Sequence, residues 1–142
     1  MSRQFTYGRQ ERLKSRKGIE RLFREGRNFS VFPFRVYYLL NEKEAPGPKG
    51  APAVVQCGFG VSSRLFKKAV DRNRVKRVSR EAWRLQKQAL TDAMGARPEQ
   101  LALFFIYTGK ELPDFNLVKE KTAVIINKLT AIISHEPRPL HT

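Results

Sequence analysis

The residues best suited to binding chemistry in this sequence form one run, RNRVKRVSREAWR, from Arg72 to Arg84. On a helix, which turns by about 100° per residue, most of its basic side chains fall between about 0° and 140° from Arg72. Arginine dominates this side, and its planar fork of N–H donors matches the oxygens of a phosphate group. The spacing therefore predicts a surface for a nucleic-acid backbone, made by Arg72, Asn73, Lys76, Arg77, Arg80 and Arg84, with Arg74 at its border.

The other side of the same helix is apolar and falls between about 220° and 300° on the helical wheel: Val75, Val78, Ala82 and Leu85. This side is expected to pack on a sheet, with Trp83 lying beside the basic side. A basic surface that served solubility alone would mix charges of both signs at i, i+4 spacing. Here Asp71 and Glu81 are the only acids nearby, so the surface favours a polyphosphate partner.

Basic residues are concentrated in two segments of the chain, whose formal net charge is +15. Residues 1–27 carry nine basic and three acidic side chains, and residues 64–87 carry ten and two. Such clustering marks a binding surface better than a diffuse excess does. Nucleic acid is the expected partner. An anionic membrane surface is the weaker alternative, because the apolar side of the basic helix is needed inside a fold.

The sequence shows no segment suited to secretion or to membrane insertion. The N-terminal residues MSRQFTYGRQERLKSRK lack the apolar core of a signal peptide, and no apolar run is long enough to span a bilayer. Cys57 is the only cysteine, which excludes an internal disulfide and a thiolate metal cluster. We expect a cytoplasmic protein with no membrane partner, in which Cys57 is a buried, inert thiol in a strand.

The elements that must position the basic run follow from local patterns of apolar, proline and glycine residues. The expected elements, in order, are a helix over 15–25 ended by Gly26, extended segments over 29–40 and 53–61, the basic helix from about 65 or 70 to 90, a strand over 101–107 and a helix from 114 or 116 to about 134. Pro33 makes the first extended segment an edge, a bulge or two short strands. The last helix shows a main apolar stripe of Val118, Ile125, Leu129 and Ile132, widened by Ile126 and Ile133.

The order α-β-β-β-α-β-α predicts one α+β domain over residues 1–142, an α/β sandwich with its helices packed on one side of a small sheet. The continuous apolar run 101–107 suits a central strand buried on both faces. Three segments lack a periodic pattern: residues 1–14 are expected to be a flexible basic arm, 41–52 a loop insert and 135–142 a frayed tail.

The sequence contains no constellation expected of a catalytic or metal site. Both histidines, His135 and His141, lie at the C-terminal end, and the acids are scattered. Gly58 and Gly60 lack the lysine and hydroxyl residue of a phosphate-binding loop. No helix-turn-helix or zinc-finger frame is present, so DNA is not the expected partner. Aromatic residues near the predicted strands offer one or two stacking surfaces for unpaired RNA bases.

Two strings of residues closely resemble the protein subunit of bacterial ribonuclease P: Val61-Ser62-Ser63-Arg64, and the segment from Ala69 to Arg84 with its Arg72-Asn73-Arg74 block. The N-terminal part is also similar, through Arg12-Leu13, Ile19, Leu22-Phe23, Glu25-Gly26 and the strand from Phe34 to Leu39. The resemblance spans about residues 10–134. It departs from the family pattern at Ser63, Phe66, Asp71 and Ile19, the last standing where the family has an aromatic residue.

The resemblance implies a division of labour, in which an RNA subunit with Mg²⁺ bound to it removes the 5′ leader of precursor tRNA and the protein holds both RNAs. The helix residues already named, 72–74, 76, 77, 80 and 84, would bind the ribonuclease P RNA. Ile19, Phe23, Tyr37, Ser62 and Arg64 would line a cleft for the single-stranded leader. The implied fold is a ribosomal-protein-like sandwich with a left-handed β-α-β crossover.

Two other functions stay open on the sequence alone. One is a stand-alone nuclease or RNA modifier that works through Glu81 or Asp71. The other is a structural RNA-binding protein of ribosomal type with a similar sandwich fold.

Overall fold

A four-stranded sheet with the strand order β1-β2-β4-β3 forms the centre of the protein. We describe it from a computed structural model, which defines residues 7–42, 53–95 and 97–135. Strands β1 (Arg27–Val31), β2 (Phe34–Glu42) and β4 (Glu99–Tyr107) are antiparallel neighbours, and β3 (Val55–Val61) pairs with β4 in parallel. The prediction of a strand interruption at Pro33 is confirmed, since β1 and β2 are two strands separated by Phe32 and Pro33.

Strand β4 lies between two neighbours and is buried along nearly all of its length, as its apolar run predicts. Its register places Tyr37 of β2 and Gly58 of β3 on either side of Phe104. A Cβ atom on Gly58 would lie 2.7 Å from the Phe104 ring. Glycine is therefore needed at this position, because any larger residue would push the aromatic ring away from the strand.

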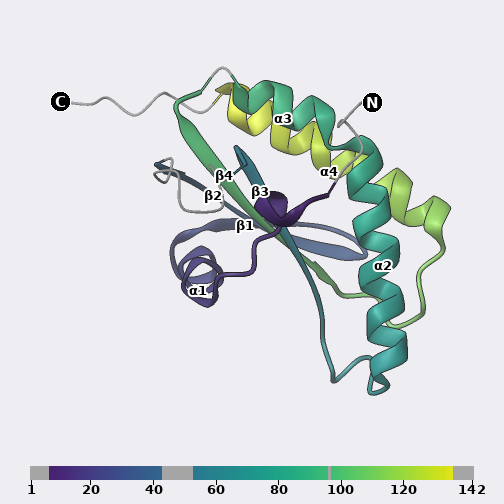
Figure 1. Cartoon of the computed structure of the whole chain (residues 1–142). Helices are drawn as coiled ribbons and strands as arrows, with labels where there is room; N and C mark the ends of the chain where they lie inside the picture. The colour runs from purple at the N-terminus through teal and green to yellow at the C-terminus, as the bar shows by residue number, and fades with distance from the viewer. Residues whose placement is uncertain (1–6, 43–52, 96, 136–142) are drawn as a thin grey trace.

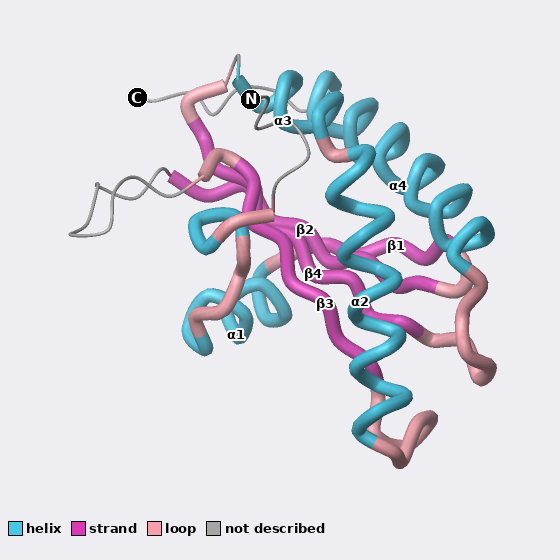
Figure 2. The backbone as a smooth tube through the Cα atoms, turned by 45° about the vertical axis from the view of Figure 1, so that its right-hand side comes forward, coloured by secondary structure: helices cyan, strands magenta, loops and turns pink. Residues whose placement is uncertain are grey.

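Three helices, α2 (Ala69–Gln86), α3 (Gln88–Gly95) and α4 (Phe115–His135), lie together on one face of the sheet (Figures 1 and 2). Their buried side chains meet the sheet in the main core, where Trp83 packs edge-on against Phe105 with ring centroids 5.7 Å apart. Strands β3 and β4 are joined through α2 and α3, which forms the expected β-α-β unit. Its left-handed sense stays a prediction of the resemblance.

Helix α1 (Arg16–Glu25) lies on the opposite face of the sheet, so the prediction that all helices share one side is wrong (Figures 1 and 2). Leu22 is fully buried there in a second core cluster with Leu13 and Ala102. The physical reason is the apolar content of β4: a strand with apolar side chains on both faces needs cover on both. Ser15 caps α1, because its hydroxyl accepts a hydrogen bond from the Gly18 N–H at 3.2 Å.

Residues 7–14, which we call the N-terminal segment, dock along β3, so the prediction of a flexible arm is wrong for this part. A short 3₁₀ helix, η1 (Arg9–Glu11), precedes a parallel bridge between Arg12 and Cys57. The Leu13 N–H donates to the Cys57 carbonyl at 3.1 Å, and the Tyr7 hydroxyl donates to the same oxygen. The segment thereby satisfies backbone groups on the outer edge of β3.

Several predicted boundaries are corrected. The basic helix ends at Gln86, and after Lys87 the separate helix α3 continues to Gly95. In α4 the two residues predicted to widen the stripe, Ile126 and Ile133, are buried, whereas Ile132 of the predicted main stripe is only half-buried. Gly26 ends α1 in an extended conformation, and its lack of a Cβ allows the backbone oxygens of neighbouring residues to approach. Most of the predicted insert, 43–52, and of the predicted tail, 136–142, lies outside the described residues.

Candidate nucleic-acid interface

Helix α2 packs on the sheet with a side that is rotated by about 70° from the predicted one. Its buried residues are Val75, Ser79, Ala82 and Trp83. The expectation that Trp83 lies beside the basic side is therefore wrong, since only 1% of this side chain is exposed. Ser79 can be buried because its hydroxyl donates to the Val75 carbonyl one turn earlier, at 2.8 Å.

The rotation brings Arg72 next to the buried side of α2. Its guanidinium donates to the carbonyl oxygens of Phe66 and Lys67, both at 2.8 Å. These two bonds hold the turn that leads from β3 into α2, so Arg72 positions the start of the helix. The prediction that Arg72 binds RNA is not tested by this contact, but part of its donor capacity is used inside the protein.

Arg84, at the other end of the run, is paired with an acid on the same helix. Its guanidinium forms two hydrogen bonds with the Glu81 carboxylate, at 2.6 Å and 3.2 Å. These bonds lower the pKa of Glu81. A carboxylate with a lowered pKa is a weaker base, which argues against Glu81 as the general base of a stand-alone nuclease.

Four polar residues of the run are exposed on one side of α2, and we call them, together with half-buried Lys76, the α2 basic face: Asn73, Arg74, Arg77 and Arg80. The structure thus keeps five of the seven predicted RNA-contacting residues available on one surface. Arg74, predicted to be at the border, belongs to this surface because of the rotation of the helix.

The N-terminal segment adjoins the α2 basic face and carries cations of its own. The Arg12 guanidinium lies over the Tyr7 ring, 5.1 Å from its centroid. Burial raises the pKa of Tyr7, and the positive charges of Arg12 and Arg80 oppose this rise. The charges of one cation of the N-terminal segment and one cation of α2 thus both act on Tyr7, so the two basic regions are neighbours in the structure.

A second candidate site lies between α1 and the sheet, and we call it the aromatic cleft: Ile19, Phe23, Tyr37 and Phe104. The Phe23 ring meets Tyr37 and Phe104 edge-on, with centroids 4.7 Å and 5.3 Å apart. Nevertheless 42% of Phe23 remains exposed, so part of its side chain is accessible to a ligand. The structure thus brings together three of the five predicted leader-contacting residues, Ile19, Phe23 and Tyr37, of which Ile19 and Tyr37 pack on the cluster around Leu22.

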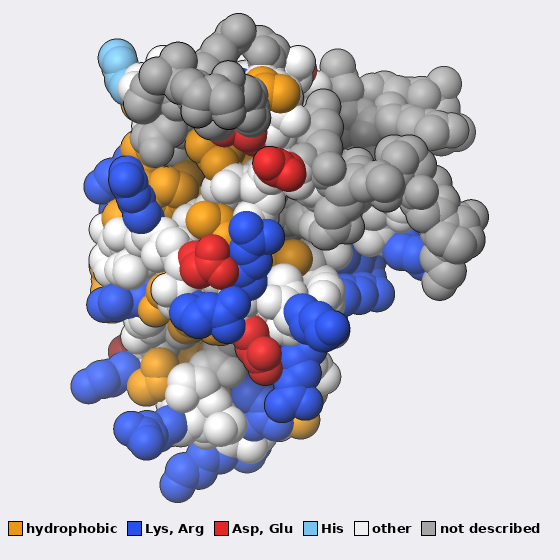
Figure 3. Space-filling view, turned by 90° about the vertical axis from the view of Figure 1, so that its left-hand side faces the viewer, with side chains coloured by type: hydrophobic (Ala, Val, Ile, Leu, Met, Phe, Trp, Pro, Cys, Tyr) orange, Lys and Arg blue, Asp and Glu red, His pale blue; other side chains and the backbone are white. Residues whose placement is uncertain are grey.

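Ser62 and Arg64 lie beyond the aromatic cleft, at the end of β3. Gly58, which neighbours Phe104, and Ser62 are separated by a distance of about 13 Å along the strand direction. The Ser62 hydroxyl accepts the Arg64 N–H at 3.1 Å, which shapes the turn and leaves the Arg64 side chain exposed. Seen from the α1 side, Lys and Arg side chains gather over the lower part of this face (Figure 3).

Sequence reasoning missed Phe104 as a cleft residue, because it lies in a continuous apolar run whose two faces cannot be told apart by periodicity. It also missed Lys17, Arg21 and Asn41, which line a pocket of about 340 Å³ beside α1. The signal that would have found Phe104 is its pairing with Tyr37 across β2 and β4, which a single sequence does not contain.

Among the residues that the structure describes, no group of three or more His, Cys, Asp and Glu side chains is placed to hold a metal ion. Within the same ranges, none of the helices combines the length and the apolar character needed to cross a bilayer.

Comparisons with known proteins agree with this geometry. The family model described as Ribonuclease P matches residues 7–130. The ribonuclease P protein component of Porphyromonas gingivalis strain ATCC 33277 is 38% identical over 115 residues, which cover 81% of this chain and 80% of the relative. The corresponding protein of Chlorobium phaeobacteroides is 31% identical, with 84% of each chain covered.

Solved structures show the same fold. The ribonuclease P protein of Thermotoga maritima superposes with a TM-score of 0.59 at 26% identity, covering 83% of this chain and 96% of that one. The Staphylococcus aureus protein gives a TM-score of 0.59 at 20% identity, which supports the fold alone. A family model spanning most of the chain, relatives above 30% identity and a shared fold place this chain in the ribonuclease P protein component family.

Proposed function

We propose that this chain is the RNA-binding, non-catalytic subunit of ribonuclease P and binds the catalytic RNA through the α2 basic face. The observation that carries the proposal is a one-sign surface in a member of this family: Arg74, Arg77 and Arg80 are exposed together. Like charges at this spacing repel each other on an isolated helix. A polyanionic partner removes that cost and gains charge-assisted hydrogen bonds to phosphate.

We infer that the aromatic cleft binds the single-stranded 5′ leader of precursor tRNA. Bases of an unpaired strand stack on aromatic rings, and each such contact contributes about 1–3 kcal/mol to binding. The partly exposed Phe23 ring, supported by Tyr37 and Phe104, provides such a surface. Ile19 forms the wall of the cleft, and Ser62 and Arg64 extend the contact toward the α2 basic face.

The proposal assigns cleavage to the RNA subunit and its Mg²⁺, while the protein positions the substrate. The carboxylates considered for a protein-based reaction are poorly suited to one, which supports this assignment: Glu81 is paired with Arg84, and Asp71 lies in the first turn of α2. A carboxylate in a first turn interacts favourably with the helix dipole and has a structural role there.

Reconstitution at low Mg²⁺ tests the proposal. Ribonuclease P RNA and a precursor tRNA are incubated with and without this protein, and the 5′ end of the product is mapped. We expect cleavage at the mature 5′ end only when both RNA and protein are present, and none with the protein alone. A protein that binds both RNAs yet leaves the cleavage rate unchanged would instead be a structural RNA-binding protein of ribosomal type.

A further inference from the structure

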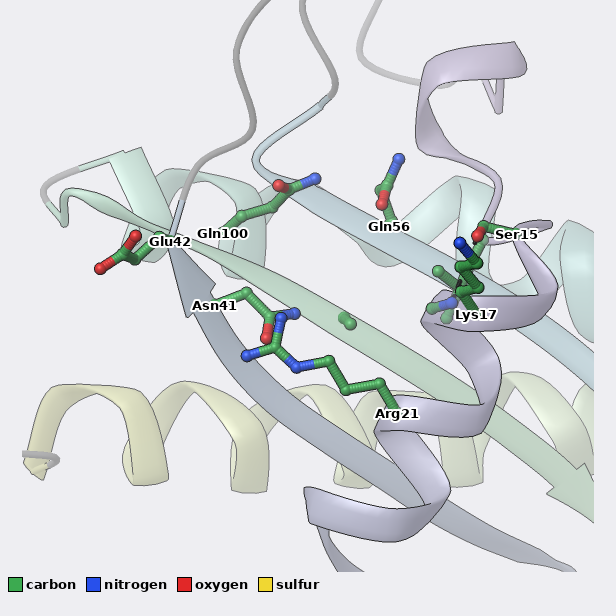
Figure 4. Close-up of a pocket in the computed structure, with 10 residues that line it drawn as sticks. Ser15, Lys17, Arg21, Asn41, Glu42, Gln56 and Gln100 are labelled. Atoms are coloured by element: carbon green, nitrogen blue, oxygen red, sulfur yellow. Dashed lines mark hydrogen bonds between the residues drawn. The ribbon is translucent and has the colours of Figure 1, made fainter.

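Two pockets lie at opposite ends of the paired strands β2 and β4. The polar pocket beside α1, with Lys17, Arg21, Asn41 and Glu42 in its lining, lies on the face of the sheet that carries the aromatic cleft (Figure 4). The other pocket, which we call the α4 pocket, lies where β1 turns into β2 and β4 leads into α4, and has a volume of about 440 Å³. Such a volume can hold a bulky side chain of a partner. None of the RNA contacts proposed above uses it.

Exposed apolar side chains gather at the α4 pocket. Seven large apolar side chains are exposed in the part of the chain that the structure describes, and three of them, Phe32, Leu112 and Leu117, line this pocket. A fourth, Val124, lies about two turns further along α4. Single exposed apolar residues are ordinary on a protein surface, whereas a gathered set marks an interaction site.

The walls of the α4 pocket are held in place by hydrogen bonds within the protein. The backbone N–H and the hydroxyl of Thr108 both donate to the Pro33 carbonyl, at 2.7 Å and 3.1 Å. The Tyr107 hydroxyl donates to the Glu111 carbonyl at 2.8 Å. These bonds tie the β1–β2 turn to the loop after β4, so the pocket is formed before a partner arrives.

The charges around the α4 pocket argue against RNA as its occupant. Lys110, Glu111 and Asp114 are exposed in its lining, which gives one cation and two carboxylates in a chain of net charge +15. The phosphates of an RNA would be repelled by the two carboxylates. A second copy of this chain would bring a net charge of the same sign. A different protein is therefore the favoured occupant.

The outer side of α4 continues the pocket as a stripe with helical spacing. Leu117, which lines the pocket, is followed at seven-residue intervals by Val124 and Ala131, and all three are exposed. On a helix these positions fall within about 40° of one another and extend over about 21 Å. Seven-residue spacing of apolar side chains is the pattern by which two helices pack along each other. The stripe therefore fits a partner helix.

Charged side chains border the stripe differently on its two sides. Lys121 and Lys128 lie on one side, also seven residues apart, and Glu120 and Asn127 lie on the other. The Lys128 ammonium lies over the Phe29 ring, so the lysine side of the stripe faces β1. Charges that border a helix–helix contact select the partner and its orientation. Acidic residues of a partner would complement the lysine side.

We propose that the α4 pocket and the outer stripe of α4 bind an amphipathic helix of a partner protein. A bulky apolar side chain of that helix occupies the pocket, its apolar side follows Leu117, Val124 and Ala131, and its acidic side lies along Lys121 and Lys128. The proposal does not depend on the proposed function, because the α2 basic face stays free for RNA.

The test uses the full-length protein and labelled synthetic peptides of about 21 residues with leucine at the a and d positions and glutamate at e and g. One comparison peptide has the same composition in scrambled order, and another has lysine in place of glutamate. At about 0.3 M salt, where exposed charges are largely screened, we expect the ordered acidic peptide to bind about tenfold more tightly than either.

Variants locate the binding surface. Val124→Asp should weaken binding of the acidic peptide about tenfold with an unchanged melting temperature, because the side chain is exposed. Val70→Asp makes the same substitution on α2, at a position that is also exposed, and should bind the peptide as the wild type does. Leu112→Asp, in the loop before α4, should weaken binding through the pocket alone.

A charge reversal tests the orientation of the helix. The double variant Lys121→Glu with Lys128→Glu should reduce the preference for the acidic over the lysine peptide about threefold to tenfold. The double variant Lys67→Glu with Lys68→Glu changes the net charge equally, in the exposed turn before α2, and should keep the preference.

Equal binding of the ordered and scrambled peptides would overturn the proposal, as would wild-type affinity in both Val124→Asp and Leu112→Asp. Ribonuclease P RNA should weaken peptide binding less than about threefold, since it lies more than a screening length away on the α2 basic face. Complete displacement by RNA would place the peptide on that face instead and contradict the proposal. Self-association of the protein in sedimentation, lost in Val124→Asp, would assign the stripe to a second copy and overturn the choice of partner.

Discussion

Residues of one type have different roles along helix α2. Arg72 holds two carbonyl oxygens of the preceding turn, and Arg84 holds the Glu81 carboxylate, whereas Arg74 and Arg77 are exposed. An arginine with its donors directed into the protein contributes to folding. An exposed arginine contributes to the binding of a partner. Its removal leaves no buried group of the protein without a hydrogen-bond partner.

We predict that two arginine variants affect different properties, one the affinity for RNA and the other the thermal stability. Arg77→Ala should weaken binding to the ribonuclease P RNA by about 1–3 kcal/mol if its contact is bidentate, with an unchanged melting temperature. Arg72→Ala should lower the melting temperature, because it releases the carbonyl oxygens of Phe66 and Lys67. Filter binding over a range of salt concentrations and thermal unfolding measure the two effects.

A phosphate contact by Arg77 would also reduce the slope of log affinity against log salt by about 1. Equal losses of RNA affinity in both variants, with equal salt slopes, would contradict the separation of roles. Lys128→Ala serves as the control, because Lys128 lies over the Phe29 ring on the α4 side of the sheet.

Phe23 provides a second prediction at this scale. Phe23→Leu should weaken binding of a precursor tRNA that has a leader by about 1 kcal/mol, the lower end for loss of one stacking ring, and leave binding of mature tRNA unchanged. Competition binding with the reconstituted enzyme measures both. Phe32→Leu is the control, because Phe32 is 70% exposed in the turn between β1 and β2. An equal loss with mature tRNA would place Phe23 outside the leader contact.

At the scale of elements, the sequence predicts where helices and strands lie along the chain. It predicts less well which face of the sheet a helix covers and which side of a helix packs. Ser15 and Asp114 mark the starts of α1 and α4 through local hydrogen bonds, which a sequence contains. The face of the sheet that α1 covers depends on packing between distant residues. The side of α2 that docks depends on Trp83 and Ser79, and neither fits a simple apolar stripe.

The N-terminal segment shows the same limit, because it is polar in sequence yet docked in the structure. Its basic and polar residues resemble those of a flexible arm, and their partners lie on β3 and after α2. Glu11 forms an ion pair with Lys87, whose side chain is only 7% exposed. Burial lowers the pKa of Lys87, and the nearby carboxylate favours its charged form.

We predict that Glu11→Ala lowers the free energy of unfolding by about 3 kcal/mol, the lower end for a broken buried ion pair, because it leaves Lys87 without its carboxylate. The double variant Glu11→Ala with Lys87→Met should recover most of the loss. Glu20→Ala removes an exposed ion pair with Arg16 and should lower the free energy by at most about 1 kcal/mol. Urea unfolding of the wild type and these three variants measures the values, and a double variant that recovers none of the loss would contradict a direct pairing.

At the scale of the whole molecule, docking of the N-terminal segment joins two basic regions that are distant in sequence. The segment pairs with the outer edge of β3 through Arg12 and Cys57, and its Tyr7 is within reach of the positive charges of Arg12 and of Arg80 on α2. On the other face, the aromatic cleft and the polar pocket lie beside α1. The sequence contains the charges of both basic regions, but their proximity depends on the docking of the N-terminal segment along β3.

Cys57 reports on this arrangement, because it is the only cysteine and lies fully buried beneath the N-terminal segment. Burial raises the pKa of the Cys57 thiol. The thiolate that reacts with labelling reagents is therefore scarcer in the folded protein than in an unfolded one at the same pH. We predict that labelling at pH 8 requires the segment to leave β3 or the protein to unfold.

RNA bound across the α2 basic face and the N-terminal segment should slow this labelling, because a ligand that binds only the docked state stabilises it. In Glu11→Ala the rate should rise without RNA, since the segment has lost its pairing with Lys87, and RNA should restore part of the protection. In Arg77→Ala the rate without RNA should match that of the wild type, while RNA protects less. Labelling of the wild type at the rate of a free thiol, or protection by RNA that Arg77→Ala leaves unchanged, would contradict a single surface formed by the two basic regions.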